Sequence, residues 1–134
     1  MGWVRKQVEL YERSGGTQGT TMVGRPVVVV TSRGARSGKL RKNPVMRVEH
    51  EGRYAAVASL AGAPEHPVWY YNLLAEPLVE LQDGAVKRDY RARLVEGEEK
   101  QQWWARAVEA FPTYEQYQAK TSRDIPVFVL EPAE

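Results

Sequence analysis

The sequence predicts a small α+β domain, mainly β, in which an antiparallel sheet forms a closed or split barrel with helices at its periphery. Short apolar runs separated by hairpin signals favour antiparallel strands. The expected order of elements, α, β, β, β, α, β, β, α, α, β, is not the strict strand–helix alternation of a parallel doubly wound fold. Because 134 residues are enough for one core, we expect a single domain over residues 1–134.

The N-terminal third is expected to supply one helix and the first strand. Residues 3–13 have the pattern of a short amphipathic helix, with Trp3 on its apolar side, and residues 14–21 are rich in Gly and Thr, as in a flexible connector. Residues 1–20 are thus a helix and a connector within the domain. Residues 27–30 are four consecutive valines, which is typical of a buried strand. This strand leads into a basic, turn-forming stretch over residues 31–42.

The middle of the chain is predicted to form hairpins around a short helix. Residues 45–48 alternate weakly up to a turn at His50-Glu51-Gly52, and residues 54–59 are expected to pair with them as an antiparallel neighbour. After a loop, a helix is expected over residues 68–75, between Pro67 and Pro77. Asp83-Gly84 predicts a hairpin between strands 78–82 and 85–95. On the second strand, alternate side chains should lie on one face: Val86, Arg88, Tyr90, Ala92 and Leu94.

The C-terminal part is predicted to be two helices and a last strand. Residues 98–111 carry apolar side chains at helical spacing, so Trp103 and Trp104 are expected in the core. A second helical segment over residues 113–120 and a strand over residues 126–130 complete the chain.

Composition excludes several classes of function. Cysteine is absent, which excludes disulfides and thiolate chemistry, and His50 and His66 lack metal-ligand spacing, so no metal is expected. A net charge of +2 gives no case for nucleic-acid binding, and no Ser-His-Asp set supports a hydrolase. Without a membrane-spanning apolar run or signal peptide, we expect a cytoplasmic protein, with peripheral membrane contact through residues 3–13 left open. The sequence specifies no oligomeric state.

The stretch from Thr31 to Pro44 is suited to holding an anion. Its fourteen residues include five cations, two glycines and three hydroxyl side chains. Glycines let backbone amides approach an oxygen, and arginine binds phosphate or carboxylate with two parallel hydrogen bonds. The pattern matches neither the phosphate-binding loop of nucleotide hydrolases nor the dinucleotide fingerprint. An ordinary solvated surface loop remains the alternative.

Aromatic side chains form a second candidate site. Trp69 and Tyr71 lie near Asn72, while Tyr114 and Tyr117 precede Thr121. Such rings could stack on a flat conjugated ligand. The alternative is that they are core residues, which is the usual place for Trp and Tyr at helical spacing.

The chain resembles the deazaflavin-dependent nitroreductases, which are actinobacterial split-barrel oxidoreductases that use coenzyme F420. The resemblance covers nearly the whole chain and rests on an ordered series of motifs: residues 30–31, 34–41, 43–44, 57–59, 67–73, 77, 90–93, 104, 111–114, 117 and 121–127. It implies a fold like that of split barrels that bind flavin mononucleotide. In that fold the deazaflavin ring would lie in a groove, with the phosphate and acidic tail on the basic stretch.

The resemblance also implies a role for individual residues. Residues implied to contact the coenzyme are Arg36, Ser37, Gly38, Lys39, Arg41, Asn43, Pro44, Val57, Ala58, Ser59, Trp69 and Asn72. In this set Arg36, Lys39 and Arg41 would hold the anionic groups, and Ser37 and Gly38 would lend donors. Residues implied at the acceptor side, with catalytic roles, are Ser59, Tyr114 and Tyr117.

The activity implied is hydride transfer from reduced F420 to an enone, quinone, lactone or nitro compound. Ser59 or Tyr117 would position the acceptor oxygen. The chain has Arg36 where family members often carry Lys, and Leu60-Ala61 where some carry charged and glycine residues, which leaves the acceptor preference open. Two alternatives remain: a split barrel that binds flavin mononucleotide or haem, and a non-catalytic anion-binding module.

Overall fold

The computed structural model describes residues 2–16, 18–19, 21–22 and 24–133. The side chain of Trp3 lies outside the described part. The elements, in chain order, are α1 (Gly2–Arg13), β1 (Thr21–Met22), β2 (Arg25–Arg33), β3 (Leu40–Met46), β4 (Glu49–His50), β5 (Arg53–Val57), the 3₁₀ turn η1 (Leu60–Gly62), α2 (Val68–Ala75), β6 (Leu78–Asp83), β7 (Val86–Val95), α3 (Gly97–Ala110), α4 (Thr113–Lys120) and β8 (Val127–Pro132).

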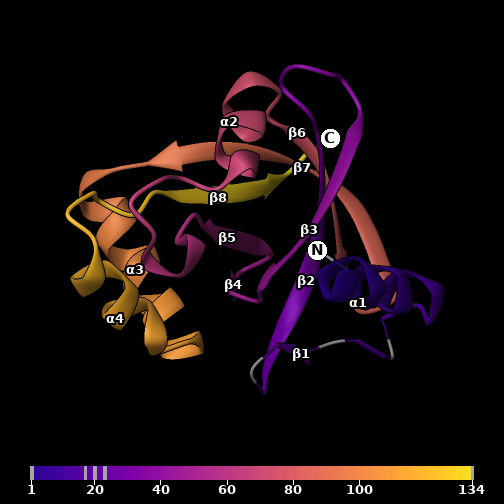
Figure 1. Cartoon of the computed structure of the whole chain (residues 1–134), viewed down its shortest axis with the longest axis horizontal. Coiled ribbons are helices and arrows are strands. Elements are labelled where there is room, and N and C mark those ends of the chain that lie inside the picture. The colour runs from indigo at the N-terminus through magenta and orange to yellow at the C-terminus, as the bar shows by residue number, and fades with distance from the viewer. Residues whose placement is uncertain (1, 17, 20, 23, 134) are drawn as a thin grey trace.

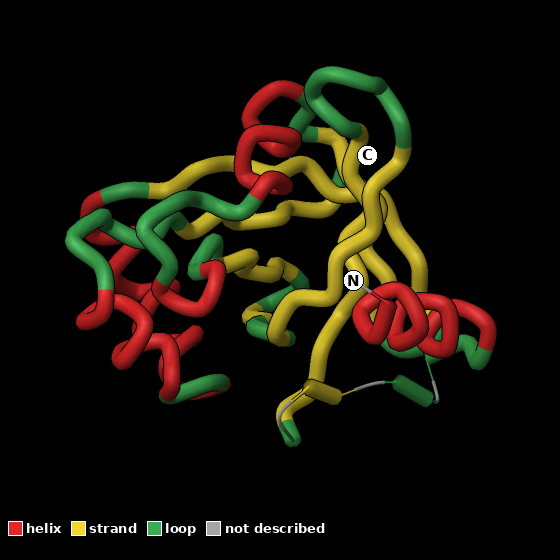
Figure 2. The backbone as a smooth tube through the Cα atoms, in the orientation of Figure 1, coloured by secondary structure: helices red, strands yellow, loops and turns green. Residues whose placement is uncertain are grey.

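All described strand pairs are antiparallel. Neighbouring strands follow the order β1-β2-β6-β7-β8-β5-β4, and β3 pairs with β2 off this path. β3 also lies beside β5, but the two share no hydrogen-bonded ladder. The barrel is therefore split between these two strands, which agrees with the split barrel that the resemblance implied. Figure 1 shows α3 and α4 on one side of the sheet and α1 on the other, and the hairpin of β2 and β3 rises beside α2 (Figure 2).

The four valines of β2 are buried because both faces of this strand are covered. Val28 and Val30 point into the barrel interior, where they join Phe128 and Leu130 of β8. Val27 and Val29 face the opposite way and pack against Val8 and Tyr11 of α1. A strand buried on both faces needs no polar alternation, which explains the continuous β-branched run.

The two C-terminal helices cover the outer face of β5 and β8. Trp103 of α3 is 2% exposed and Ala107 is 0% exposed, and both pack on Val127 and Val129 of β8. Trp104 is half-buried against the same cluster. Both tryptophans therefore lie in or against the core.

Within the described residues, no helix combines the length and the apolar character needed to cross a bilayer.

The structure corrects one detail of the predicted sheet and adds to another. Residues 45 and 46 belong to β3, whose ladder with β2 runs from Val27↔Met46 to Arg33↔Leu40. The ladder with the other side of this hairpin, β5, is formed by Glu49–His50, and the Ala55 N–H also donates to the Val48 carbonyl at 2.9 Å. The reason is that β2 is nine residues long and keeps β3 paired along its length. In β7, Val86 and Arg88 are exposed because this end of the strand extends beyond the packed core, which takes only Tyr90, Ala92 and part of Leu94.

Candidate functional site

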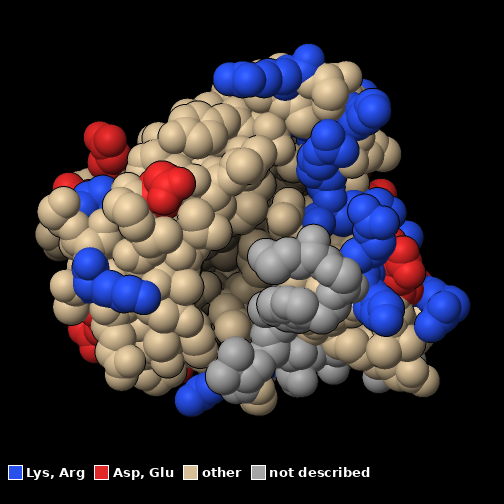
Figure 3. Space-filling view, in the orientation of Figure 1, with Lys and Arg blue, Asp and Glu red and all other residues tan. Residues whose placement is uncertain are grey.

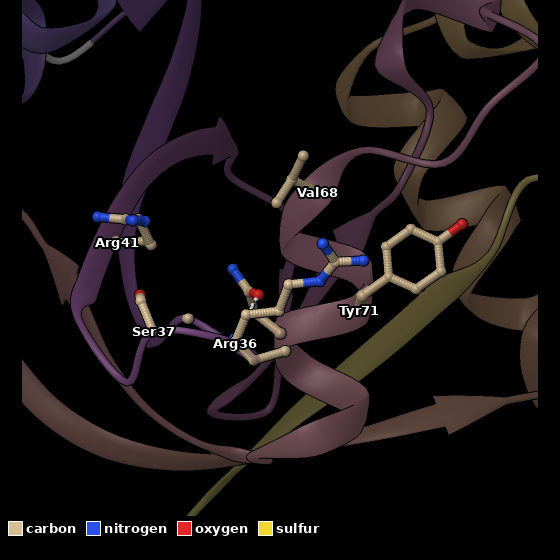
Figure 4. Close-up of a pocket in the computed structure, with 8 residues that line it drawn as sticks. Arg36, Ser37, Arg41, Val68 and Tyr71 are labelled. Atoms are coloured by element: carbon tan, nitrogen blue, oxygen red, sulfur yellow. Dashed lines mark hydrogen bonds between the residues drawn. The ribbon is translucent and has the colours of Figure 1, made fainter.

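A cleft of about 640 Å³ lies between the turn that joins β2 to β3 and one face of α2. The turn comprises residues 34–39, and we call it the basic turn. The residues that line the cleft are Gly34, Ala35, Arg36, Ser37, Arg41, Val68, Tyr71 and Asn72. Figure 4 shows Arg36 extending toward the Tyr71 ring on one wall, while Arg41 and Ser37 lie on the other. The sequence predicted this turn as a longer basic stretch, but residues 40–42 are already part of β3.

The basic turn is held in shape by its own backbone. The Gly34 N–H donates to the Lys39 carbonyl at 2.7 Å, and the Gly38 N–H donates to the Gly34 carbonyl at 2.9 Å. Gly38 has a φ of 71°, a conformation that favours glycine. Its N–H is therefore already used within the turn, so Gly38 shapes the site instead of lending a donor. The Ser37 hydroxyl accepts from the Lys39 N–H at 3.2 Å and keeps its own hydrogen to donate.

Asn72 connects the two walls of the cleft. Its side chain is 4% exposed, and its Oδ1 accepts a hydrogen bond from the Ala35 N–H at 2.9 Å. A buried amide that pairs with a loop N–H fixes the loop relative to the helix, since an unpaired buried donor would be unfavourable. The short helix α2 thus sets the position of the basic turn.

Of the five cations in this region, two have a partner among the described residues and three do not. Lys42 pairs with Glu12 of α1 at 2.7 Å, and Arg33 donates to the Gly38 carbonyl at 2.9 Å. The side chains of Arg36, Lys39 and Arg41 are exposed and enter no ion pair or hydrogen bond among the described residues. Lys and Arg gather on the side of the molecule that carries this turn, next to a hollow in the surface (Figure 3). The three unpaired cations are the ones that the resemblance assigns to the anionic groups of the coenzyme.

Asn43 and Trp69 lie beside a separate, enclosed gap that is too small to admit a water molecule. Its lining is Val30, Ser32, Asn43, Val45, Ala56, Trp69 and Leu73. The Ser32 hydroxyl is buried and has no hydrogen-bond partner among the described residues. Pro44 instead lines a groove of about 770 Å³ between α1 and β3, and Arg41 borders both this groove and the cleft. The predicted coenzyme residues on β3 are therefore distributed over three adjoining spaces.

The segment at the end of β5 is buried and contains Val57, Ala58 and Ser59. Their side chains are 6%, 0% and 9% exposed. Ser59 opens the turn η1, in which Leu60 and Ala61 have φ values of 43° and 54°. Positive φ is uncommon for residues other than glycine and is kept only where the surroundings hold it. We call residues 58–66 the Ser59 loop.

Arg123 holds the Ser59 loop, a role that the sequence did not reveal. Its guanidinium donates to the carbonyls of Ala58, Ser59 and Ala63 at 3.1, 2.7 and 2.9 Å. The residue belongs to the motif over 121–127, but only the fold brings it next to a loop about sixty residues earlier in the chain.

His66 is the fourth partner of Arg123. Its Nδ1 lies 2.9 Å from the Arg123 guanidinium, and its ring stacks on Tyr70 with a centroid distance of 4.2 Å. Since arginine only donates, Nδ1 must carry the lone pair and the imidazole must be neutral. Burial, and secondly the Arg123 charge, lower the pKa of His66 below its usual value.

The described residues contain no group of three or more His, Cys, Asp or Glu side chains placed to hold a metal ion.

The two predicted acceptor-side tyrosines occupy different environments. Tyr114 is 4% exposed and packs edge-to-face on Phe111, and burial raises the pKa of its hydroxyl. Tyr117 is half-buried, and its backbone abuts Gly62 of the Ser59 loop. The structure therefore brings Tyr117 next to the Ser59 loop and leaves Tyr114 in the core, and the catalytic roles of both remain predictions.

Comparisons with known proteins agree with one family. A model of the F420H(2)-dependent quinone reductase family matches residues 3–132. The chain is 30% identical over 125 residues to the F420H(2)-dependent quinone reductase Rv1261c of Mycobacterium tuberculosis. The aligned region covers 90% of this chain and 84% of the relative. A solved F420-H2 dependent reductase, FDR-A, is 55% identical with a TM-score of 0.76, covering 80% of this chain and 95% of its own. A solved domain-swapped dimer is 51% identical with a TM-score of 0.79, covering 97% of this chain and 98% of its own.

These matches confirm the resemblance to F420-using reductases and agree with the split barrel found here. The protein is therefore an oxidoreductase, and its hydride donor is reduced coenzyme F420. The chain belongs to the F420H(2)-dependent quinone reductase family.

Proposed function

We propose that the protein reduces quinones, and that it holds the phosphate and acidic tail of F420 on the basic turn. The observation that carries this proposal is a set of three unpaired cations, Arg36 and Lys39 on the basic turn and Arg41 beside it on β3. The basic turn is already ordered by its backbone and by Asn72. Such groups can bind an anion without first breaking an ion pair of their own.

The residues fit the two parts of the coenzyme differently. Arg36, Lys39 and Arg41 bind its anionic groups at the exposed rim, and the free hydrogen of the Ser37 hydroxyl adds a donor. The flat ring needs an apolar surface with a few polar groups, and the cleft of about 640 Å³ offers such a surface on α2, where Val68 and Tyr71 lie beside Asn72. The resemblance also implies that Val57 and Ala58 contact the ring.

The chemistry of the coenzyme is hydride donation from its reduced ring. The protein supplies the position and the electrostatics. Two electrons enter the quinone with the hydride, negative charge develops on the quinone oxygen, and a proton completes the hydroquinone. We assign the positioning of that oxygen to Ser59, with Tyr117 beside the same loop.

Coenzyme binding is tested by titrating the protein with oxidised F420 and following tryptophan quenching. Arg36→Ala and Arg41→Ala should each raise the Kd about 10-fold, because each removes a charge-assisted hydrogen bond to an anion. Lys42→Ala is the matched control: it removes a cation from the same strand, but one that is paired with Glu12. We expect its Kd to change less than about 2-fold.

The acceptor is tested by the loss of F420H2 absorbance with menadione, compared with a nitroaromatic compound and an enone at equal concentration. Faster turnover of the quinone supports the proposal. Binding of flavin mononucleotide without binding of F420, or equal Kd changes in Lys42→Ala and Arg36→Ala, would contradict it.

A further inference from the structure

The Arg123 guanidinium binds neutral partners only. Its donors contact three backbone carbonyls and one imidazole nitrogen, and no carboxylate accepts from it among the described residues. The side chain is half-buried. An arginine in this setting contributes its rigid fork of donors, which lysine cannot reproduce.

The carbonyls that Arg123 binds determine where the neighbouring N–H groups point. The described peptide bonds are all trans, so the C=O and N–H of one peptide unit point in opposite directions. The Ala58 and Ser59 carbonyls both face Arg123. The N–H groups of Ser59 and Leu60 therefore point away from Arg123. Neither has a hydrogen-bond partner among the described residues.

Two adjacent, unpartnered N–H groups beside residues with positive φ form a concave donor site. Concavities of this kind bind anionic oxygens. The Ser59 hydroxyl is carried by the same residue as one of the two N–H donors and adds a third donor to this loop. The φ values of Leu60 and Ala61 require external support, and Arg123 provides it from one side.

Arg123 is itself fixed by α4. The Gln118 Nε2 donates to the Arg123 carbonyl at 2.8 Å, and the Gln118 Oε1 accepts from the Ile125 N–H at 3.0 Å. The Arg123 N–H donates to the Thr121 hydroxyl at 3.3 Å. The backbone on both sides of the arginine is thus anchored, and its side chain can act as a rigid brace.

We propose that Arg123 is a positioning residue that presents the Ser59 and Leu60 N–H groups to the quinone oxygen that gains negative charge during hydride transfer. This inference rests on the proposed quinone reduction. The hydride from F420H2 brings two electrons to the quinone, the charge settles on the oxygen facing these N–H groups, and a proton from water then neutralises it. Donors aimed at such an oxygen stabilise the transition state more than the bound substrate.

The test compares Arg123→Lys and Arg123→Gln with the wild type, using the menadione assay and the F420 titration. We expect kcat to fall about 10- to 100-fold in Arg123→Gln, while the Kd for F420 and the KM for menadione change less than about 3-fold. Arg123→Lys should lie between the two, since lysine keeps the charge and part of the donor set. The matched control is Arg93→Lys, because Arg93 makes three hydrogen bonds to Glu99 and Glu131 on the surface of the barrel. Its kcat should stay within about 2-fold of the wild type.

Circular dichroism separates a loss of fold from a loss of catalysis, and Arg123→Lys decides the question if Arg123→Gln does not fold. Unchanged kcat in folded Arg123→Lys and Arg123→Gln would overturn the proposal. A rise in the F420 Kd equal to the loss in kcat would overturn it as well, since the loop would then serve coenzyme binding. A wild type that binds F420 but does not turn over menadione would instead refute the proposed quinone reduction.

Discussion

The basic turn and the Ser59 loop are built in opposite ways. The basic turn is exposed, carries unpaired cations and donates one backbone hydrogen bond, from the Ala35 N–H, to the Asn72 side chain of α2. The Ser59 loop begins in the buried core, contains backbone with positive φ and receives three carbonyl contacts from Arg123. Exposed cations avoid the cost of desolvation until a ligand arrives, whereas donors that stabilise a developing charge must be fixed in advance. The difference suggests that one region provides affinity and the other provides rate.

Helix α2 touches both regions. Asn72, in its second turn, holds the basic turn, and His66, just before its start, contacts Arg123. The eight-residue helix therefore sets the spacing between the two regions. Variants on either side should show whether affinity and rate can be separated.

The largest effect is expected from Gly62→Ala, which should displace the Ser59 loop. Gly62 has a φ of 78°, and an added Cβ would lie 2.8 Å from the Tyr117 carbonyl oxygen, a backbone atom that cannot turn aside. We expect the free energy of unfolding to fall by about 3 kcal/mol, from backbone strain and overpacking together. Thermal unfolding measures the loss.

Gly52→Ala is the control for Gly62→Ala. Gly52 has a φ of 80°, but an added Cβ would meet nothing within 4 Å. Its cost should be the strain alone, about 1–2 kcal/mol. Equal losses in the two variants would show that contact with α4 does not hold the Ser59 loop.

A matched pair of amide variants tests the separation of affinity from rate. Asn72→Ala frees the Ala35 N–H and should raise the F420 Kd about 5-fold, with kcat at saturating coenzyme within about 2-fold of the wild type. Gln118→Ala frees the backbone around Arg123 and should lower kcat about 5-fold, with little change in Kd. The F420 titration and the menadione assay measure both quantities. If each variant changed Kd and kcat together, the two regions would not be independent.

The smallest effect is a pH dependence centred on His66. Arg123, Tyr70 and Tyr71 contact its ring, and the other charged groups lining the groove next to it are Glu96, Lys100 and Asp124. Because the pKa of His66 is lowered in the folded protein, the unfolded chain binds more protons on acidification. The stability that neutral His66 contributes is therefore complete above its unfolded pKa, about 6.5, and is lost as the pH falls through the folded pKa.

His66→Gln keeps a side-chain acceptor for Arg123 but does not titrate. Between pH 7 and pH 5 the wild type should lose more stability than His66→Gln, by less than about 1 kcal/mol because solvent screens a half-exposed group. Urea unfolding at several pH values measures the difference. Parallel stability curves would show that protonation of His66 leaves the Arg123 contact intact.

Much of the fold could be predicted from local sequence, because the signals involved are local. The four valines of β2, the Asp83-Gly84 hairpin and the proline boundaries of α2 each specify a conformation within a few residues. The pairing of residues 45–46 was wrong because strand partners depend on the length of β2, which local pattern does not encode.

The candidate site likewise has features that local sequence predicts and features that depend on long-range contacts. The sequence by itself determined the barrel class, the basic turn and the kind of ligand that such a turn suits, since these depend on residue types that lie close together in the chain. Only the tertiary structure decided which cations remain unpaired, because the partner of Lys42 lies thirty residues away on α1. It alone brought Arg123 to the Ser59 loop, because a guanidinium finds its carbonyl partners through the packing of α4 and η1 and not through their spacing in the sequence.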